Sequence, residues 1–273
     1  MPRRPWAGLV GAAARFLAGS LPFLLAPLLV LVVIWIPEVQ HYRAPEVEIS
    51  EPMIEAALRT PADEVLTELR EFSLLPIEGR THEVEVSLAE AMLDGRLALP
   101  GLPEARFTVG FAAQDFDRLP ASLQLWYAGW IVPDVLLGAY ADTGREAFFA
   151  AARDFIASWD AFERGTWLPV GLLWNDHAVA ARAQVLVQYW RIARSRPDAG
   201  PDAGRAIFAQ AARYGWFLSN PGHFTFATNH GLMQNLGLLE LGLAFPGLPG
   251  AQDYERIALQ RLGEQLPYLI DDA

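Results

Sequence analysis

A series of long helical blocks fills the second half of the chain and constrains the fold more than any other feature. From Leu119 onward, apolar residues recur at helical spacing, and the blocks are separated by Gly, Pro and Asp. Helices of this length joined by short loops pack as antiparallel neighbours. The sequence therefore predicts a mainly α fold of helical hairpins in series. The expected helices cover residues 120–142, 144–162, 175–195, 203–218, 228–245 and 251–269.

The segment before Pro37 is apolar and follows a basic N-terminus. Arg3, Arg4 and Arg15 precede an uncharged run from Phe16 to Ile36. At a helical rise of about 1.5 Å per residue, this run would span a hydrocarbon core of roughly 30 Å. We expect a transmembrane signal anchor in a bacterial-type inner membrane. The basic N-terminus would be cytoplasmic and the main domain periplasmic or extracellular.

A cleaved signal peptide, with its apolar stretch at residues 23–36, is the alternative interpretation of this segment. No small-x-small cleavage site follows, which favours an uncleaved anchor. The expected organisation is a basic terminus at 1–15, an anchor at 16–36, a tether at 37–60 and a helical domain at 61–273.

Three local patterns lie between the anchor and the helical series. The tether is rich in Pro and Glu, and we expect an extended piece at Val47–Ser50 rather than packed structure. Apolar residues at helical spacing predict a helix within Pro61–Phe72. The alternating run Thr81–Ser87 predicts a strand.

Composition excludes several kinds of chemistry. The sequence contains no lysine, which removes Schiff-base chemistry and the P-loop, and no cysteine, which removes disulfides and thiolate metal sites. The net charge of −11 disfavours nucleic acid as a partner. No histidine or carboxylate ligand pattern and no Gly-x-Ser-x-Gly elbow is present, so we expect neither a metal ion nor another cofactor.

The first candidate cluster is Trp174-Asn175-Asp176-His177, with Arg182 downstream. Asn175 is a natural N-cap and Asp176 suits the positive end of a helix dipole, so a capped helix start explains the pattern. The functional interpretation is a polar group at a helix mouth, where Trp174 stacks on a sugar ring and His177 and Arg182 meet an anion. Both interpretations of His177 stay open, while Arg182 also suits a structural ion pair.

The second cluster lies in the turn-rich stretch 219–231, which opens a very apolar helix. Thr228 is placed to cap that helix, leaving Asn229 and His230 in its first turn. Backbone donors there would face a bound carboxylate, and His223 lies earlier in the same loop. A structural role for the Asn-His pair remains the alternative.

These two clusters resemble the N-terminal helical part of the heparinase II/III-like polysaccharide lyases, which include related alginate lyases. The first carrier is residues 174–177 followed by Ala181-Arg182. The second is residues 228–231 leading into Gly237-Leu238-Leu239-Glu240-Leu241. The resemblance covers roughly residues 60–273 and implies an incomplete (α/α) toroid.

The resemblance implies β-elimination on an acidic, uronate-containing polysaccharide. Asn229 matches the position that neutralises the C5 carboxylate, and His230 matches the adjacent histidine, which assists charge neutralisation or proton transfer. The substrate-binding candidates are Trp174, Asn175, His177, Arg182 and His223. Because the net charge is negative, local arginines would have to make the cleft positive: Arg182, Arg191, Arg194 and Arg213.

The sequence also departs from the family pattern. The family tyrosine that acts as base or acid, and a β-sheet domain with a further histidine, would lie beyond Ala273, while Tyr254 and Tyr268 fall in a helix as expected packing residues. A non-catalytic glycan-binding or assembly module of an exopolysaccharide system is therefore the alternative function. A hydrolase would need two flanking carboxylates, for which Asp176 and Glu240 are present without a pairing pattern.

Overall fold

The structure is a computed structural model of the chain and describes residues 23, 25–32, 42–59, 73–166, 170–196 and 201–270. The chain divides into two compact units, residues 1–43 and 44–273. In the first unit residues 25–30 are helical, and most of the predicted anchor lies outside the described residues. Among the helices that are described, none has both the length and the apolar character needed to cross a membrane.

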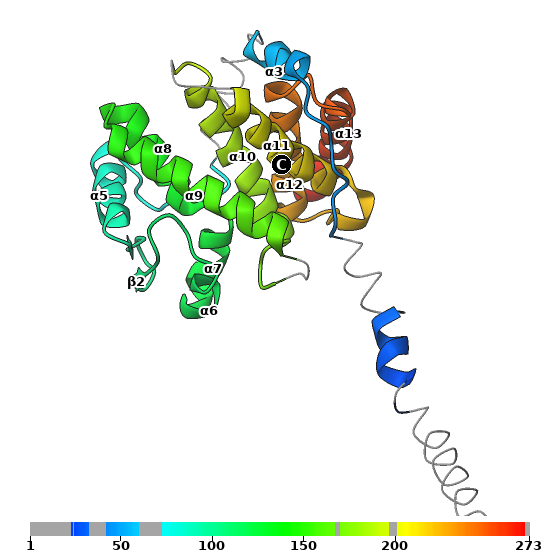
Figure 1. Cartoon of the computed structure of the whole chain (residues 1–273), viewed down its shortest axis with the longest axis horizontal. Helices are drawn as coiled ribbons and strands as arrows, with labels where there is room; N and C mark the ends of the chain where they lie inside the picture. Colours follow the sequence, from blue (N-terminus) through cyan, green and yellow to red (C-terminus); the bar gives the residue numbers. More distant parts are fainter. Residues whose placement is uncertain are drawn as a thin grey trace, which may run out of the picture. The chain divides into compact units, whose positions relative to one another are not determined.

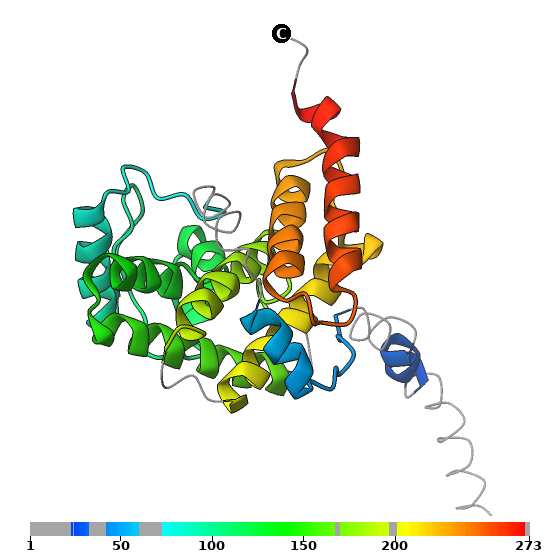
Figure 2. The same ribbon diagram turned by 90° about the horizontal axis from the view of Figure 1, so that it is seen from above.

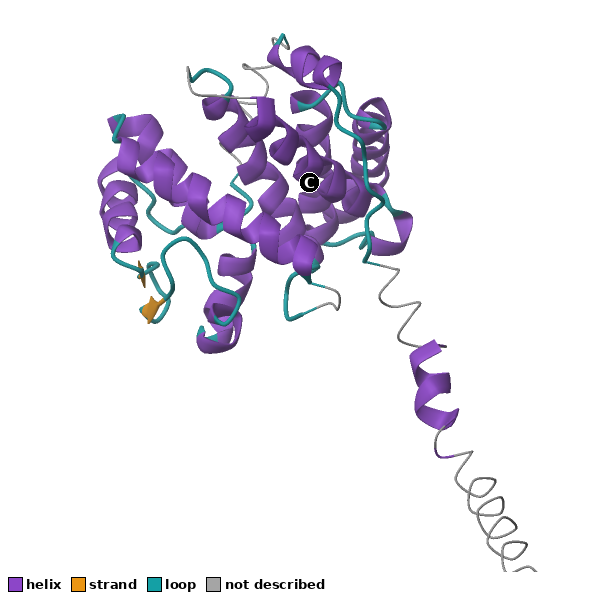
Figure 3. Cartoon of the chain, in the orientation of Figure 1, coloured by secondary structure: helices purple, strands orange, loops and turns teal. Residues whose placement is uncertain are grey.

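The second unit is mainly α-helical, which confirms the predicted fold class (Figures 1 and 3). The described part of this unit has one small sheet, an antiparallel pair in which Arg96 is opposite Arg106 and Leu97 opposite Ala105. The elements in order are α3 (Glu51–Leu58), α5 (His82–Leu93), β1 (Arg96–Leu97), β2 (Ala105–Arg106), α6 (Asp115–Arg118), α7 (Ala121–Ala128), α8 (Ile131–Thr143), α9 (Glu146–Gly165), α10 (Asp176–Ala193), α11 (Pro201–Ser219), the 3-10 turn η2 (Pro221–His223), α12 (Asn229–Ala244) and α13 (Ala251–Leu269).

The helices pack in an alternating order. Helix α10 packs on both α11 and α12, while α12 also packs on α13, and α8 pairs with α9 and α5. Figure 2 shows α12 and α13 side by side as a hairpin. The side chains from Ala178 to Trp190 on α10 are all buried, as expected of a central helix covered on every side. A double layer with α10 and α12 inside is the pattern that an (α/α) toroid produces.

The single helix predicted at residues 120–142 is wrong, because the chain breaks at Gly129 and Trp130. Trp130 adopts a left-handed conformation with φ of 71°, which costs a non-glycine residue roughly 1–2 kcal/mol. Its indole is fully buried, 6.0 Å from both Trp159 and Tyr214. Burial of this large ring offsets the backbone strain and separates α7 from α8.

The strand predicted at Thr81–Ser87 is also wrong, because these residues begin helix α5. The Thr81 side chain caps the helix by accepting a hydrogen bond from the Val84 amide at 3.4 Å. Glu83 and Glu85 lie in the first turn, where carboxylates favour the helix dipole. The alternation in this run hid a helix start.

The tether expected at 37–60 contains packed structure at its end. Helix α3 buries Ile54 and Ala57, and it packs on α11 where Gly204 leaves room for the Ile54 side chain. Arg194 donates a hydrogen bond to the Ala57 carbonyl at 3.1 Å. Residues 43–50 have no regular structure, as expected, whereas the helix predicted within Pro61–Phe72 lies outside the described residues.

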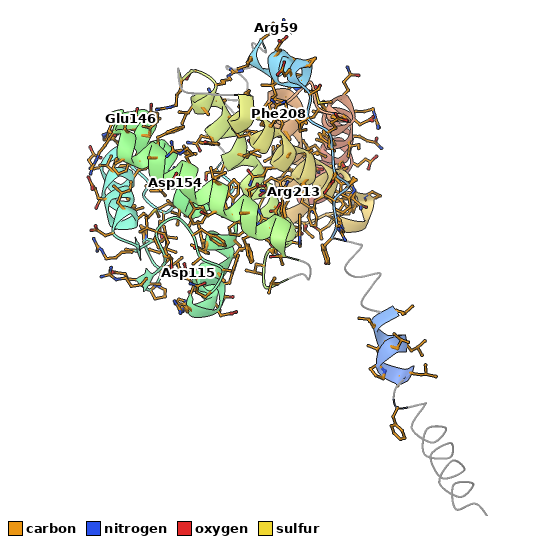
Figure 4. The ribbon with its side chains drawn as sticks, viewed as in Figure 1. Arg59, Asp115, Glu146, Asp154, Phe208 and Arg213 are labelled. Atoms are coloured by element: carbon orange, nitrogen blue, oxygen red, sulfur yellow. The ribbon has the colours of Figure 1, made fainter. Side chains whose placement is uncertain are left out.

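Buried ion pairs and aromatic rings hold α9 to its neighbours. Arg213 on α11, labelled in Figure 4, pairs with Asp160 and Glu163 of α9. The other Glu163 oxygen accepts hydrogen bonds from Trp159 at 3.2 Å and Tyr214 at 3.1 Å. Every acceptor of this buried carboxylate therefore serves the α9–α11 contact.

Glu240 is a buried carboxyl group between α10 and α12. Its Oε1 accepts a hydrogen bond from the Gln184 amide at 2.9 Å, and Gln184 Oε1 accepts one from the Leu74 amide at 2.9 Å. Burial raises the pKa of Glu240 to about 7, although the Gln184 hydrogen bond and the charge of Arg191 act in the opposite direction. This carboxyl thus connects α12, α10 and the segment before α5.

The first prediction concerns Glu240 and pH. Since its folded pKa lies above its unfolded value, its stabilising contribution is complete below the unfolded pKa of 4.5 and is lost as the pH rises through about 7. Glu240→Gln keeps an acceptor for Gln184 and removes the charge. We expect the variant to exceed the parent in unfolding free energy at pH 8 by on the order of 3 kcal/mol, and by little at pH 4. Urea unfolding at both pH values measures this, and parallel pH curves for the two proteins would contradict it.

Candidate functional site

Two capped helix starts meet at the candidate site. Asn175 caps α10 by accepting a hydrogen bond from the Ala178 amide at 3.1 Å. Thr228 caps α12 by accepting one from the Gly231 amide at 3.0 Å, as predicted. Asp176 and His230, in the first turns of these two helices, approach each other within 3.1 Å. The packing of α10 on α12 therefore joins the two clusters that lie far apart in the sequence.

Asp176 is the centre of this group. Its Oδ1 accepts hydrogen bonds from His230 Nδ1 at 3.1 Å and from the His177 amide at 2.9 Å. Its Oδ2 is 3.0 Å from the Thr225 hydroxyl. We call Asp176, His177, Thr225 and His230 the Asp176–His230 cluster. The sequence showed Asp176 only as a helix-dipole residue, and its spacing from Thr225 and His230 gave no signal of their contact.

His177 belongs to the same cluster. Its ring lies 5.2 Å from that of His230, in an edge-to-face arrangement. Its Nε2 is 2.9 Å from the Leu74 carbonyl oxygen, to which it donates. The helix-cap and the polar-cluster interpretations of this segment thus both hold: Asn175 caps the helix, and His177 faces His230.

Gln234 fixes the loop that leads to His230. This fully buried side chain accepts a hydrogen bond from the Thr225 amide at 3.1 Å and donates one to the His223 carbonyl at 2.7 Å. The loop is therefore held against the second turn of α12. Sequence analysis missed this role, although a glutamine at a core position of an apolar helix was the available signal.

Trp174 and His223 flank the cluster through a stack of rings. Trp174 lies 5.6 Å from Phe217, and Phe217 lies 4.1 Å from His223 with the two planes at 18°. His223 is buried and donates from Nδ1 to the Phe217 carbonyl at 3.0 Å. Trp174 is partly exposed and can still offer a ring edge to a ligand, whereas the structure gives His223 a packing role rather than the predicted substrate contact.

Arg182 cannot contact a substrate, because its side chain is completely buried. It donates to the Ala128 carbonyl at 2.8 Å and to the Leu173 carbonyl at 2.5 Å. Its guanidinium also lies over the rings of Trp159 and Tyr214. Its predicted place among the substrate-binding residues is therefore wrong. It supports the turn that carries Trp174 to His177.

Two other arginines predicted to make a cleft positive have structural partners as well. Arg213 is paired with Asp160 and Glu163, and Arg194 donates to Ala57. Neither brings an uncompensated positive charge to the Asp176–His230 cluster. Any anion bound there must rely on histidine, amide and backbone donors.

The geometry gives His230 a defined orientation. Because Nδ1 donates to Asp176, Nε2 is the ring nitrogen directed to other groups, and the side chain is 39% exposed. A histidine held in this way by a carboxylate can take or give a proton at Nε2, since the carboxylate stabilises the imidazolium. Asn229 precedes it and is exposed, so its amide is accessible. Across the described residues, no group of three or more histidine and carboxylate side chains is arranged to hold a metal ion.

The fold is similar to part of heparan sulfate lyase HepC from Pedobacter heparinus. The structures align with a TM-score of 0.57 at 16% identity, covering 75% of this chain and 34% of that chain. A HepC mutant aligns with a TM-score of 0.57 at 16% identity, covering 86% of this chain and 40% of that chain. No family profile and no curated protein sequence matches the chain. The predicted resemblance to the helical part of such lyases is confirmed as a likeness of fold, over a chain that spans well under half of HepC.

The second prediction tests the structural role of Arg182. Arg182→Ala leaves the Ala128 and Leu173 carbonyls without their donor and opens a cavity beneath two rings. We expect a loss of roughly 3–5 kcal/mol of unfolding free energy by chemical denaturation. Arg182→Lys should rescue little, because an ammonium cannot reproduce the planar two-point contact. A variant as stable as the parent would contradict this role.

Proposed function

We propose that the second unit is a polysaccharide lyase-like domain that binds a uronate-containing polysaccharide at the Asp176–His230 cluster. The observation that carries this proposal is the contact between His230, Asp176 and His177, on a fold similar to part of HepC. Both histidines and the exposed Asn229 amide lie where two helices begin.

The proposed reaction is β-elimination. A base removes the C5 proton of the uronate, the C5–H electrons form the C4–C5 double bond, and the C4–O4 bond breaks as O4 takes up a proton. Asn229 would hydrogen-bond the C5 carboxylate, whose negative charge grows as the proton leaves. His230 would neutralise charge or transfer a proton through Nε2, with Asp176 fixing its ring. Such contacts accelerate the reaction because they strengthen in the transition state.

A glycan-binding module without catalysis is the second candidate. It is favoured by the share of HepC that the chain spans and by the tyrosines of α13. Tyr254 is buried against Gly215, and Tyr268 packs on Phe226 at 5.1 Å between ring centres. Neither has a contact with the Asp176–His230 cluster among the described residues. The two candidates share the binding site and differ in whether a bond is broken.

The third prediction tests both candidates with one set of variants. The parent chain is mixed with alginate and with heparan sulfate, and the absorbance of the unsaturated uronate is followed. For a lyase, we expect Asn229→Ala and His230→Ala each to lower the rate by about 100-fold or more. The exposed amide variant Gln260→Leu, on the far half of α13, is the matched control and should keep the parental rate.

The binding arm separates the alternatives. Retention of the same polysaccharides, lowered by His230→Ala and unchanged by Gln260→Leu, without any gain in absorbance, identifies the glycan-binding module. Absence of both elimination and retention, or equal values for all variants, would overturn the proposed site.

We also propose that residues 16–36 anchor the chain in a bacterial-type inner membrane, with the second unit on the periplasmic or extracellular side. This rests on the uncharged run and the three preceding arginines. The fourth prediction is that the full chain sediments with membranes and resists carbonate extraction, whereas deletion of residues 1–36 releases it. A full chain recovered entirely in the soluble fraction would contradict the anchor.

A further inference from the structure

A polar cavity of about 260 Å³ lies between α5, α8 and α10, apart from the Asp176–His230 cluster. Every side chain that lines it is polar or charged. Glu85, Asp134, Gln184 and Gln188 contribute to this lining and are themselves buried. Its volume is just below the range of roughly 300–1,000 Å³ that suits drug-sized ligands, so a single small ring fits it.

An ion-pair network explains only part of this lining. Arg80 donates to Glu85 at 2.5 Å and to Asp134 at 2.8 Å, which ties α5 to α8. Gly138 is required beside this network, because any side chain there would collide with Glu85. Gln184 and Gln188 come from a third helix and are one turn apart, so both amides face the same space. Burying four such groups around an open volume is costly unless a polar ligand uses it.

The charges in the cavity select among ligands. Two carboxylates, Glu85 and Asp134, surround one guanidinium, so the network carries one net negative charge. Burial alone would lower the pKa of Arg80, but Asp134 and Glu85 outweigh burial and raise it, which keeps Arg80 charged. His82, at the rim, is paired with another acid, Asp142, at 2.9 Å. Hydroxyl and ammonium donors therefore suit this cavity, and a carboxylate or sulfate is repelled.

We propose that this cavity binds one sugar ring whose polar groups are donors, and that it prefers an amino sugar with an unsubstituted amine to a uronate. The cavity lies two to three turns along α10 from His177, on the same side of the helix, because seven and eleven residues are near-multiples of the helical repeat. Leu74 bridges the two places, since its carbonyl contacts His177 and its amide contacts Gln184. That both places bind one polymer rests on the proposed function, whereas the preference of the cavity does not.

Saturation-transfer NMR with the full chain tests the preference, using glucosamine, glucose and glucuronate as separate probes. We expect glucosamine to bind most tightly, glucose less tightly and glucuronate least. Gln188→Leu keeps the side-chain volume and removes the amide, so it should weaken glucosamine binding about tenfold. The exposed variant Gln260→Leu should bind as the parent does.

Two further variants make every outcome decisive. Should Gln188→Leu fail to fold by circular dichroism, His82→Ala, whose side chain is half exposed, replaces it and should also weaken glucosamine binding. His230→Ala should leave glucosamine binding unchanged, so glucosamine binding that persists while uronate binding fails overturns only the proposed function. Glucuronate binding as tightly as glucosamine, no glucosamine binding at all, or binding lost in His230→Ala and kept in the cavity variants would overturn the cavity proposal.

Discussion

The buried guanidinium of Arg182 is the interaction on which the rest of the second unit depends. It joins the end of α7, through the Ala128 carbonyl, to the turn before α10, through the Leu173 carbonyl. A charge without solvent is costly, and here two carbonyls and the faces of Trp159 and Tyr214 compensate for the lost water. Gly129 makes this contact possible, because a side chain there would crowd Ala181 of α10.

The candidate site inherits its geometry from that arrangement. Leu173, held by Arg182, is followed directly by the residues that bring Asp176 and His177 to the start of α10. From the other side, buried Gln234 holds the loop that brings Thr225 and His230. Asp176 then accepts hydrogen bonds from both sides of the junction, which orients the His230 ring. Rigid support of this kind is what a histidine needs in order to transfer a proton at a defined position.

The sequence predicted the long helices and their caps because both signals are local. Asn175 and Thr228 cap α10 and α12 as their positions indicated. The break at Trp130 was not predictable, since its positive φ is compensated by tertiary burial. The start of α5 was missed because an alternating run resembles a strand when capping by Thr81 is ignored. The start of α3 was missed because its burial depends on Gly204, far along the chain.

The site was predictable in part for the same reason. His177 and His230 were identified from their helix starts, but their contact depends on how α10 packs on α12. Arg182 and His223 carry the residue types of ligand-binding groups, and only their burial reveals that they are structural. Spacing along a chain reports the face of a helix and does not report what covers that face.

The central claim is that His177 and His230 form one site for a uronate. The most direct measurement is the response of the histidine ring signals in an NMR titration of the full chain with an oligomer of uronic acids alone. Our account predicts that the His177 and His230 signals shift together and saturate together, while the His82 signals stay unchanged. Unchanged His177 and His230 signals, or shifts at His82 instead, would contradict it.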